Sequence, residues 1–105
     1  MARKRIFTET TPLGYRVVLT RDRWREIIRF KHPALAGCEA EVRACVRDPE
    51  AIRGSQKDPD VQLYYRTYAR GFVCVVVCPS QNEERFVVTA YFTKTIKKGQ
   101  ELWIK

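Results

Sequence analysis

Long apolar segments are absent from this sequence of 105 residues. No apolar run approaches the roughly 18 residues that a membrane-spanning helix needs. The first residues, MARKRIFTETTPLG, are basic but lack the apolar stretch of a signal peptide. We therefore expect a cytoplasmic protein with no membrane contact. In that compartment its four cysteines are expected to stay reduced.

Carboxylates are scarce relative to cations. Twelve Asp and Glu stand against twenty Lys and Arg, which leaves a formal net charge of +8 and a pI near 9.6. Such a positive field favours polyanionic partners: nucleic acid, an acidic protein or an anionic membrane surface. The acidic residues fall mostly on expected helix surfaces and in turns, whereas a two-metal nuclease needs several converging carboxylates. A metal-dependent nuclease is therefore not expected.

The cysteines do not have the spacing of a zinc site. Cys74 and Cys78 lie four strand residues apart, or roughly 13 Å. Cys38 and Cys45 lie two helical turns apart, or roughly 10 Å. One tetrahedral ion cannot join either pair without a bend in the chain, so we interpret all four as small core residues. A Gly-rich phosphate loop and a dinucleotide fingerprint are also missing, and we expect no metal and no cofactor.

The length suits one domain with one core. We predict a basic tail over residues 1–12 and a single domain over residues 13–105. The expected helices end near His32 and near Asp48. The expected strands lie at 15–20, 52–55, 61–69, 72–78 and 85–93, with a short one near 102–104. The order β-α-α-β-β-β-β predicts an α+β fold, with two N-terminal helices packed on one face of a four- to five-stranded antiparallel sheet.

Strand alternation predicts one polar and aromatic sheet face. Its expected members are Arg53, Ser55, Tyr64, Arg66, Thr89 and Tyr91. Cations interleaved with tyrosines suit single-stranded RNA, because arginine pairs with phosphate and aromatic rings stack on bases. The alternative is an ordinary solvated face, where threonine, tyrosine and arginine are common for their strand propensity.

The chain has one histidine, His32, which precedes Pro33 at the expected end of the first helix. RNA cleavage by its own 2′-OH needs an acid, a base and cations for the phosphorane charge. His32 is the natural acid or base. The alternative is a structural residue that complements the helix dipole. The phosphate-binding candidates are Arg53, Lys57 and Arg66, and the hydroxyl donors are Ser55, Tyr64, Thr89 and Tyr91.

Three stretches resemble a known nuclease superfamily: FKHPALAG, DPEAIRGS and FVVTAYFT. The superfamily groups barnase, EndoU, colicin E5/D-type and RelE-like toxins, and the likeness over residues 15–105 is to its phage and toxin–antitoxin branch, PBECR. The resemblance implies a barnase- or RelE-like fold and a metal-independent endoribonuclease. It also implies a toxin that an antitoxin neutralises, which we expect to be an acidic protein. By motif, the catalytic set implied is His32, Arg53, Thr89 and Tyr91.

Two other functions stay open. The same basic face suits an RNA-binding module without catalysis, and it suits a domain that binds an acidic protein. All three hypotheses predict binding to polyanions, but only the nuclease predicts cleavage that leaves a 2′,3′-cyclic phosphate.

Overall fold

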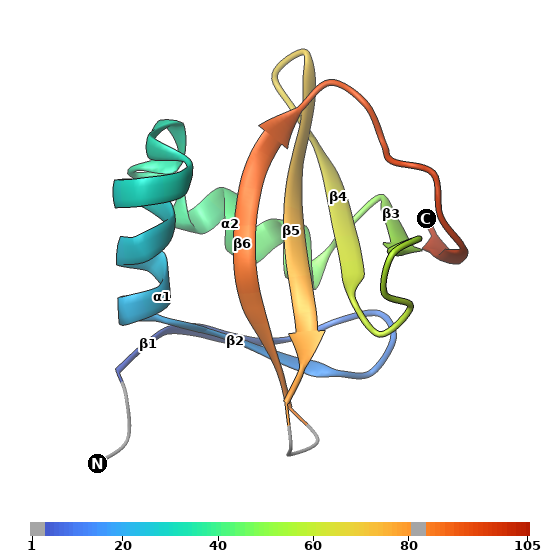
Figure 1. Ribbon diagram of the computed structural model, residues 1–105, viewed down its shortest axis with the longest axis horizontal. Helices are drawn as coiled ribbons and strands as arrows, with labels where there is room; N and C mark the ends of the chain where they lie inside the picture. Colours follow the sequence, from blue (N-terminus) through green and yellow to red (C-terminus); the bar gives the residue numbers. More distant parts are fainter. Residues whose placement is uncertain (1–3, 81–83) are drawn as a thin grey trace.

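The computed structural model describes residues 4–80 and 84–105. Seven strands form one sheet in the order β1-β2-β6-β5-β4-β3-β7. The strands are β1 (Arg5–Thr10), β2 (Arg16–Thr20), β3 (Ala51–Gly54), β4 (Gln62–Tyr68), β5 (Gly71–Pro79), β6 (Arg85–Thr93) and β7 (Glu101–Ile104). The sheet is mixed, because β2 and β6 pair in parallel while the other neighbours are antiparallel. In Figure 1, β1 and β2 run across the direction of the other strands.

The helical part is short and irregular. It comprises α1 (Arg21–Glu26), the π-helix η1 (Ile27–Lys31), the 3₁₀ helix η2 (Pro33–Leu35) and α2 (Glu39–Arg47). Thr20 caps α1, since its hydroxyl accepts a hydrogen bond from the Arg23 amide at 3.2 Å. Over residues 4–80 and 84–105, none of the helices has the length and apolar character to cross a bilayer.

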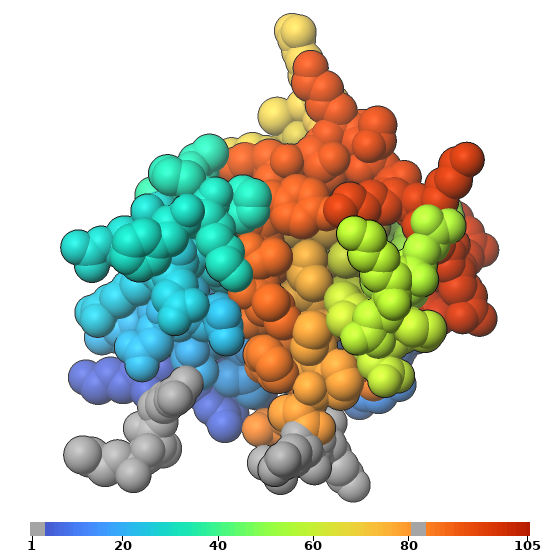
Figure 2. Space-filling view, viewed as in Figure 1, coloured from blue at the N-terminus to red at the C-terminus, as the bar shows by residue number. Residues whose placement is uncertain are grey.

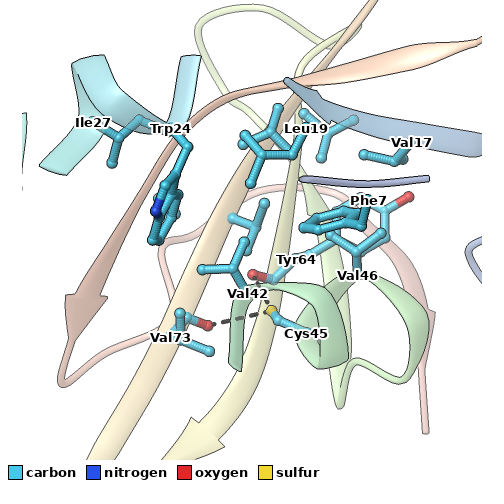
Figure 3. Close-up of a cluster of buried hydrophobic side chains, with 14 of the residues drawn as sticks. Phe7, Val17, Leu19, Trp24, Ile27, Val42, Cys45, Val46, Tyr64 and Val73 are labelled. Atoms are coloured by element: carbon cyan, nitrogen blue, oxygen red, sulfur yellow. Dashed lines mark hydrogen bonds between the residues drawn. The ribbon is translucent and has the colours of Figure 1, made fainter. Parts of the chain in front are cut away.

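The main core lies between the sheet and α2, which crosses behind β4 to β6 in Figure 1. Val42, Cys45 and Val46 follow helical spacing on one side of α2 and are fully buried. Figure 3 shows the Cys45 thiol donating to the carbonyl oxygens of Tyr64 (3.3 Å) and Val73 (3.5 Å). Burial raises the pKa of Cys45 well above its ordinary value, so it behaves as a small core residue.

The protein is α+β, but the predicted architecture is wrong. The sheet has seven strands and is mixed, rather than four or five antiparallel strands, and the first predicted helix is a six-residue α1 followed by a π-helix. Half of the predicted tail, residues 1–12, is strand β1, whose Phe7 is buried in the core. The stretch RIFTET was not predicted as a strand, because only one of its side chains is buried and the pattern of a core strand is weak. The strand predicted at 52–55 is β3, and it is an interior strand of the sheet, because β7 pairs along its outer side.

Candidate functional site

The sheet face opposite α2 carries a second, smaller cluster of side chains. We call it the open face and define it by Arg53, Tyr65, Cys74, Thr89 and Tyr91. Tyr65, Cys74 and Tyr91 lie opposite one another across β4, β5 and β6. In Figure 2 this face is flanked by the teal segment that follows α1 and by the lime β3–β4 connection. No helix crosses it in Figure 1.

His32 reaches this face because β2 pairs with β6 only at Arg85 and Phe86. The rest of β6 is flanked by α1 and η2, and His32 lies directly before η2. The His32 amide closes the π-turn on the Ile27 carbonyl at 2.6 Å, and the fully buried Leu35 anchors the next turn. The half-buried His32 ring then lies 5.6 Å from the Tyr91 ring, centroid to centroid, at an angle of 37°.

Lys97, in the β6–β7 connection (residues 94–100), also lies beside the Tyr91 ring. Its ammonium lies 5.6 Å from the Tyr91 ring centroid. Its backbone amide donates to the Tyr65 hydroxyl at 3.1 Å, which holds the connection over the sheet. A side chain at Gly99 would place Cβ 2.1 Å from the Gly54 carbonyl oxygen, so this approach requires glycine. Sequence reasoning missed Lys97, because nothing local ties a loop lysine to a strand tyrosine 32 positions away.

The tyrosine hydroxyls of the open face have pKa values above the ordinary value for tyrosine. Burial raises the pKa of Tyr65 to about 12, and the neighbouring Cys74 adds to the shift. Burial likewise raises the pKa of Tyr91 well above its ordinary value, again with Cys74 contributing. Both hydroxyls therefore stay protonated near neutral pH, and neither can act as a base there.

Three buried polar atoms of the open face lack a hydrogen-bond partner within residues 4–80 and 84–105. They are Arg53 Nε, Thr89 Oγ1 and the Tyr91 hydroxyl. The Tyr91 hydroxyl is close enough to Cys74 for the thiol to raise the Tyr91 pKa, but the two groups are not in hydrogen-bonding geometry. Such atoms are uncommon in folded proteins. Because the Thr89 and Tyr91 oxygens are buried, they do not face a phosphate in this conformation. The accessible basic groups beside Tyr91 are His32 and Lys97.

Arg53 lies on the open face but apart from His32. It comes from β3, three strands away from Thr89 on β6. Its guanidinium contacts the Gly99 carbonyl at 3.5 Å and Glu101 at 3.9 Å, both long contacts. Arg53 therefore borders the site rather than completing its centre.

Ser55 and Lys57 lie in the β3–β4 connection that rims the open face in Figure 2. The Ser55 hydroxyl accepts a hydrogen bond from the Lys57 amide at 3.3 Å, which shapes the turn. The Lys57 side chain is exposed and forms no ion pair with any described residue. This rim therefore adds an exposed cation that is not paired with a carboxylate in the described part of the chain.

The prediction that Tyr64 and Arg66 lie on the polar and aromatic sheet face is wrong. Their register opposite Val75 and Val73 turns them towards α2. Tyr64 is fully buried, its hydroxyl donates to Gln62 at 3.1 Å, and burial raises its pKa to about 12. Arg66 donates to the Asp48 carbonyl at 2.6 Å and to its carboxylate at 3.1 Å. Neither side chain therefore lies on the open face.

All four cysteines are free thiols. Burial raises the pKa of Cys74, which keeps the open-face thiol protonated. Among residues 4–80 and 84–105, no three His, Cys, Asp or Glu side chains cluster closely enough to hold a metal ion.

No protein-family model, curated protein or solved structure matches this chain. The resemblance to the nuclease superfamily therefore stays a prediction.

Proposed function

We propose that the protein is a metal-independent endoribonuclease that binds single-stranded RNA across the open face. The observation that carries the proposal is the placement of His32 and Lys97 around the Tyr91 ring, each at 5.6 Å. This combines a proton-transfer group, a cation and an aromatic ring within one cluster of a protein with net charge +8.

In the proposed reaction, the RNA 2′ oxygen attacks the adjacent phosphorus and the bond to the 5′ oxygen breaks. The products are a 2′,3′-cyclic phosphate and a 5′ hydroxyl. His32 takes the proton from the 2′ oxygen or gives one to the leaving oxygen, and water makes the other of these two proton transfers. Lys97 stabilises the charge that develops on the phosphorane. Tyr91 positions both groups through its ring, and Arg53 and Lys57 hold flanking phosphates.

A second candidate is an RNA-binding module without catalysis. The burial of the Thr89 and Tyr91 oxygens favours this candidate, because these hydroxyls are then not placed to act on RNA. His32, the one histidine of the sequence, is left as the acid–base side chain for a reaction with two proton transfers. In that case the same rings and cations bind RNA, and no strand is cut.

One incubation separates the two candidates. Purified protein is mixed with single-stranded RNA, with and without EDTA, and product ends are identified. The nuclease predicts 2′,3′-cyclic phosphate ends at the same rate in both samples. Intact RNA that stays bound to the protein would support the binding module instead, and loss of cleavage in EDTA would contradict a metal-independent mechanism.

We further propose that the nuclease is the toxin of a toxin–antitoxin pair, with an acidic protein as antitoxin. The exposed Lys57 and Lys97, which form no ion pair among the described residues, support a complementary acidic surface. Expression in bacteria should arrest growth, and His32→Ala should relieve the arrest. Growth arrest that persists in the His32→Ala strain would contradict toxicity through cleavage.

A further inference from the structure

A separate pocket lies at the end of the sheet, where the β4–β5 turn meets the end of β6. Its volume is about 340 Å³, and the residues that matter are Tyr68, Arg70, Gly71, Phe72, Phe92 and Lys94. In Figure 2 the yellow β4–β5 turn and the orange-red end of β6 stand together at the top of the molecule. The size falls within the range of small-molecule sites, which begins at about 300 Å³.

Aromatic rings form the apolar wall of this pocket. Tyr68 and Phe92 stack with their centroids 4.9 Å apart and their planes 17° apart. Phe92 packs against the main core, which fixes the stack. Tyr68 is 39% exposed and therefore keeps ring surface available to a further flat group. Phe72 lines the pocket from the neighbouring strand.

Two cations stand at the same pocket with no carboxylate among its lining residues. Arg70 and Lys94 are exposed, and neither pairs with an acidic side chain in the described part of the chain. Their strands approach closely, since a Cβ at Gly71 would lie 2.5 Å from the Thr93 carbonyl oxygen. Glycine at this position lets the turn that carries Arg70 close onto the end of β6 beside Lys94.

We propose that this pocket, at the end of the sheet, binds one nucleotide of the RNA strand that reacts at His32. Its base stacks on Tyr68, and its phosphate lies between Arg70 and Lys94. Tyr68 and Phe92 lie on the α2 side of the sheet, so an RNA strand that leaves the open face reaches them by passing around the end of β6, where Thr93 and Lys94 line the pocket. The assignment rests on the proposed RNA-binding function and adds a stacking subsite to it.

The test uses a 2′-O-methylated oligonucleotide, which lacks the attacking hydroxyl and cannot be cut by this mechanism. The full-length protein is titrated with this oligonucleotide and with the same backbone lacking its bases. Tyr68→Ala should weaken binding of the first by about 5- to 150-fold, the range for loss of one stacked base. It should leave binding of the base-free backbone unchanged. Tyr68→Phe keeps the ring and should retain affinity.

Tyr15→Ala is the control for the loss of a tyrosine ring elsewhere on the protein, because Tyr15 packs against Arg85, at 4.0 Å, in another part of the molecule. Arg70→Ala should weaken binding of both ligands, since it removes a phosphate contact. Equal losses for Tyr68→Ala and Tyr15→Ala would overturn the subsite, as would an equal loss for the base-free backbone. A circular dichroism melt of each variant shows that it is folded.

The outcomes separate the subsite from the nuclease. Tyr68-dependent binding by a protein that never cuts RNA would support the subsite and refute the nuclease. His32-dependent cleavage with binding indifferent to Tyr68→Ala would refute the subsite alone.

Discussion

Replacing Tyr65 by phenylalanine removes the hydroxyl that holds Lys97 above the open face. The Lys97 amide donates to that hydroxyl at 3.1 Å. A typical hydrogen bond contributes about 0.5–1.5 kcal/mol net to stability. If all of that free energy serves to place Lys97, its loss reduces the cleavage rate by roughly two- to twelve-fold. The free energy of unfolding should fall by the same modest amount.

Tyr64→Phe is the matched control, on the adjacent position of the same strand. The Tyr64 hydroxyl donates to the buried Gln62 side chain on the other side of the sheet. Its removal leaves a buried acceptor unpaired, which costs about 1–3 kcal/mol. We therefore expect Tyr64→Phe to be the less stable variant and the more active one.

The assay is single-turnover cleavage of a fluorescent RNA, with urea unfolding of each variant in parallel. Lys97→Ala sets the upper limit of the loss in rate, and Tyr65→Phe in the Lys97→Ala background should cause little further loss. Positioning by Tyr65 is refuted if the activities of the two tyrosine variants simply follow their stabilities.

Three further predictions concern stability. Leu35→Ala should lower the free energy of unfolding by about 2–5 kcal/mol, because Leu35 is fully buried, and urea unfolding measures the loss. Burial raises the pKa values of Tyr64 and Tyr65 to about 12, so the folded state favours their neutral forms. The free energy of unfolding should be at its full value below about pH 10 and should fall as pH rises towards 12. Tyrosinate absorbance should appear as the protein unfolds. Hydrogen bonds from Lys105 and Arg66 lower the pKa of Asp48, and hydrogen bonding to Thr67 lowers that of Glu50. The stability that these two carboxylates contribute should therefore be present above about pH 4.5 and lost as pH falls through the lowered pKa values. An unchanged melting temperature across that range would contradict the prediction.

The long strands and the two helical regions were predictable because they carry strong local patterns. FVCVVVC is apolar throughout and forms the central strand β5, and Thr20 precedes α1 as an N-cap. Strand β1 was missed because its stability comes from backbone pairing with β2 rather than from a strong side-chain pattern, whereas the short strand predicted near 102–104 is present as β7. Hydrogen bonds between backbones leave little trace in side-chain chemistry.

The faces of the strands were harder to predict than their positions. The register of β4 sends Tyr64 and Arg66 towards α2, although their polarity suggested the other face. In β6 a register shift opposite Val76 and Val77 puts both Val87 and Ala90 on the core side, which simple alternation forbids. His32 and Tyr91 were predicted as site residues and lie together, but Lys97 depends on the path of a long connection.

The most direct test of the account is the cleavage rate of His32→Ala beside that of Lys98→Ala, a matched control for a surface substitution next to Lys97. The account predicts a loss of roughly 10²–10⁴-fold for His32→Ala, the usual contribution of one acid–base group. Its melting temperature should change little, because the interaction of a side chain with a helix end contributes less than about 1 kcal/mol. Lys98→Ala should cut RNA at the wild-type rate. Normal cleavage by His32→Ala, with a much lower melting temperature, would contradict the account and make His32 a structural residue.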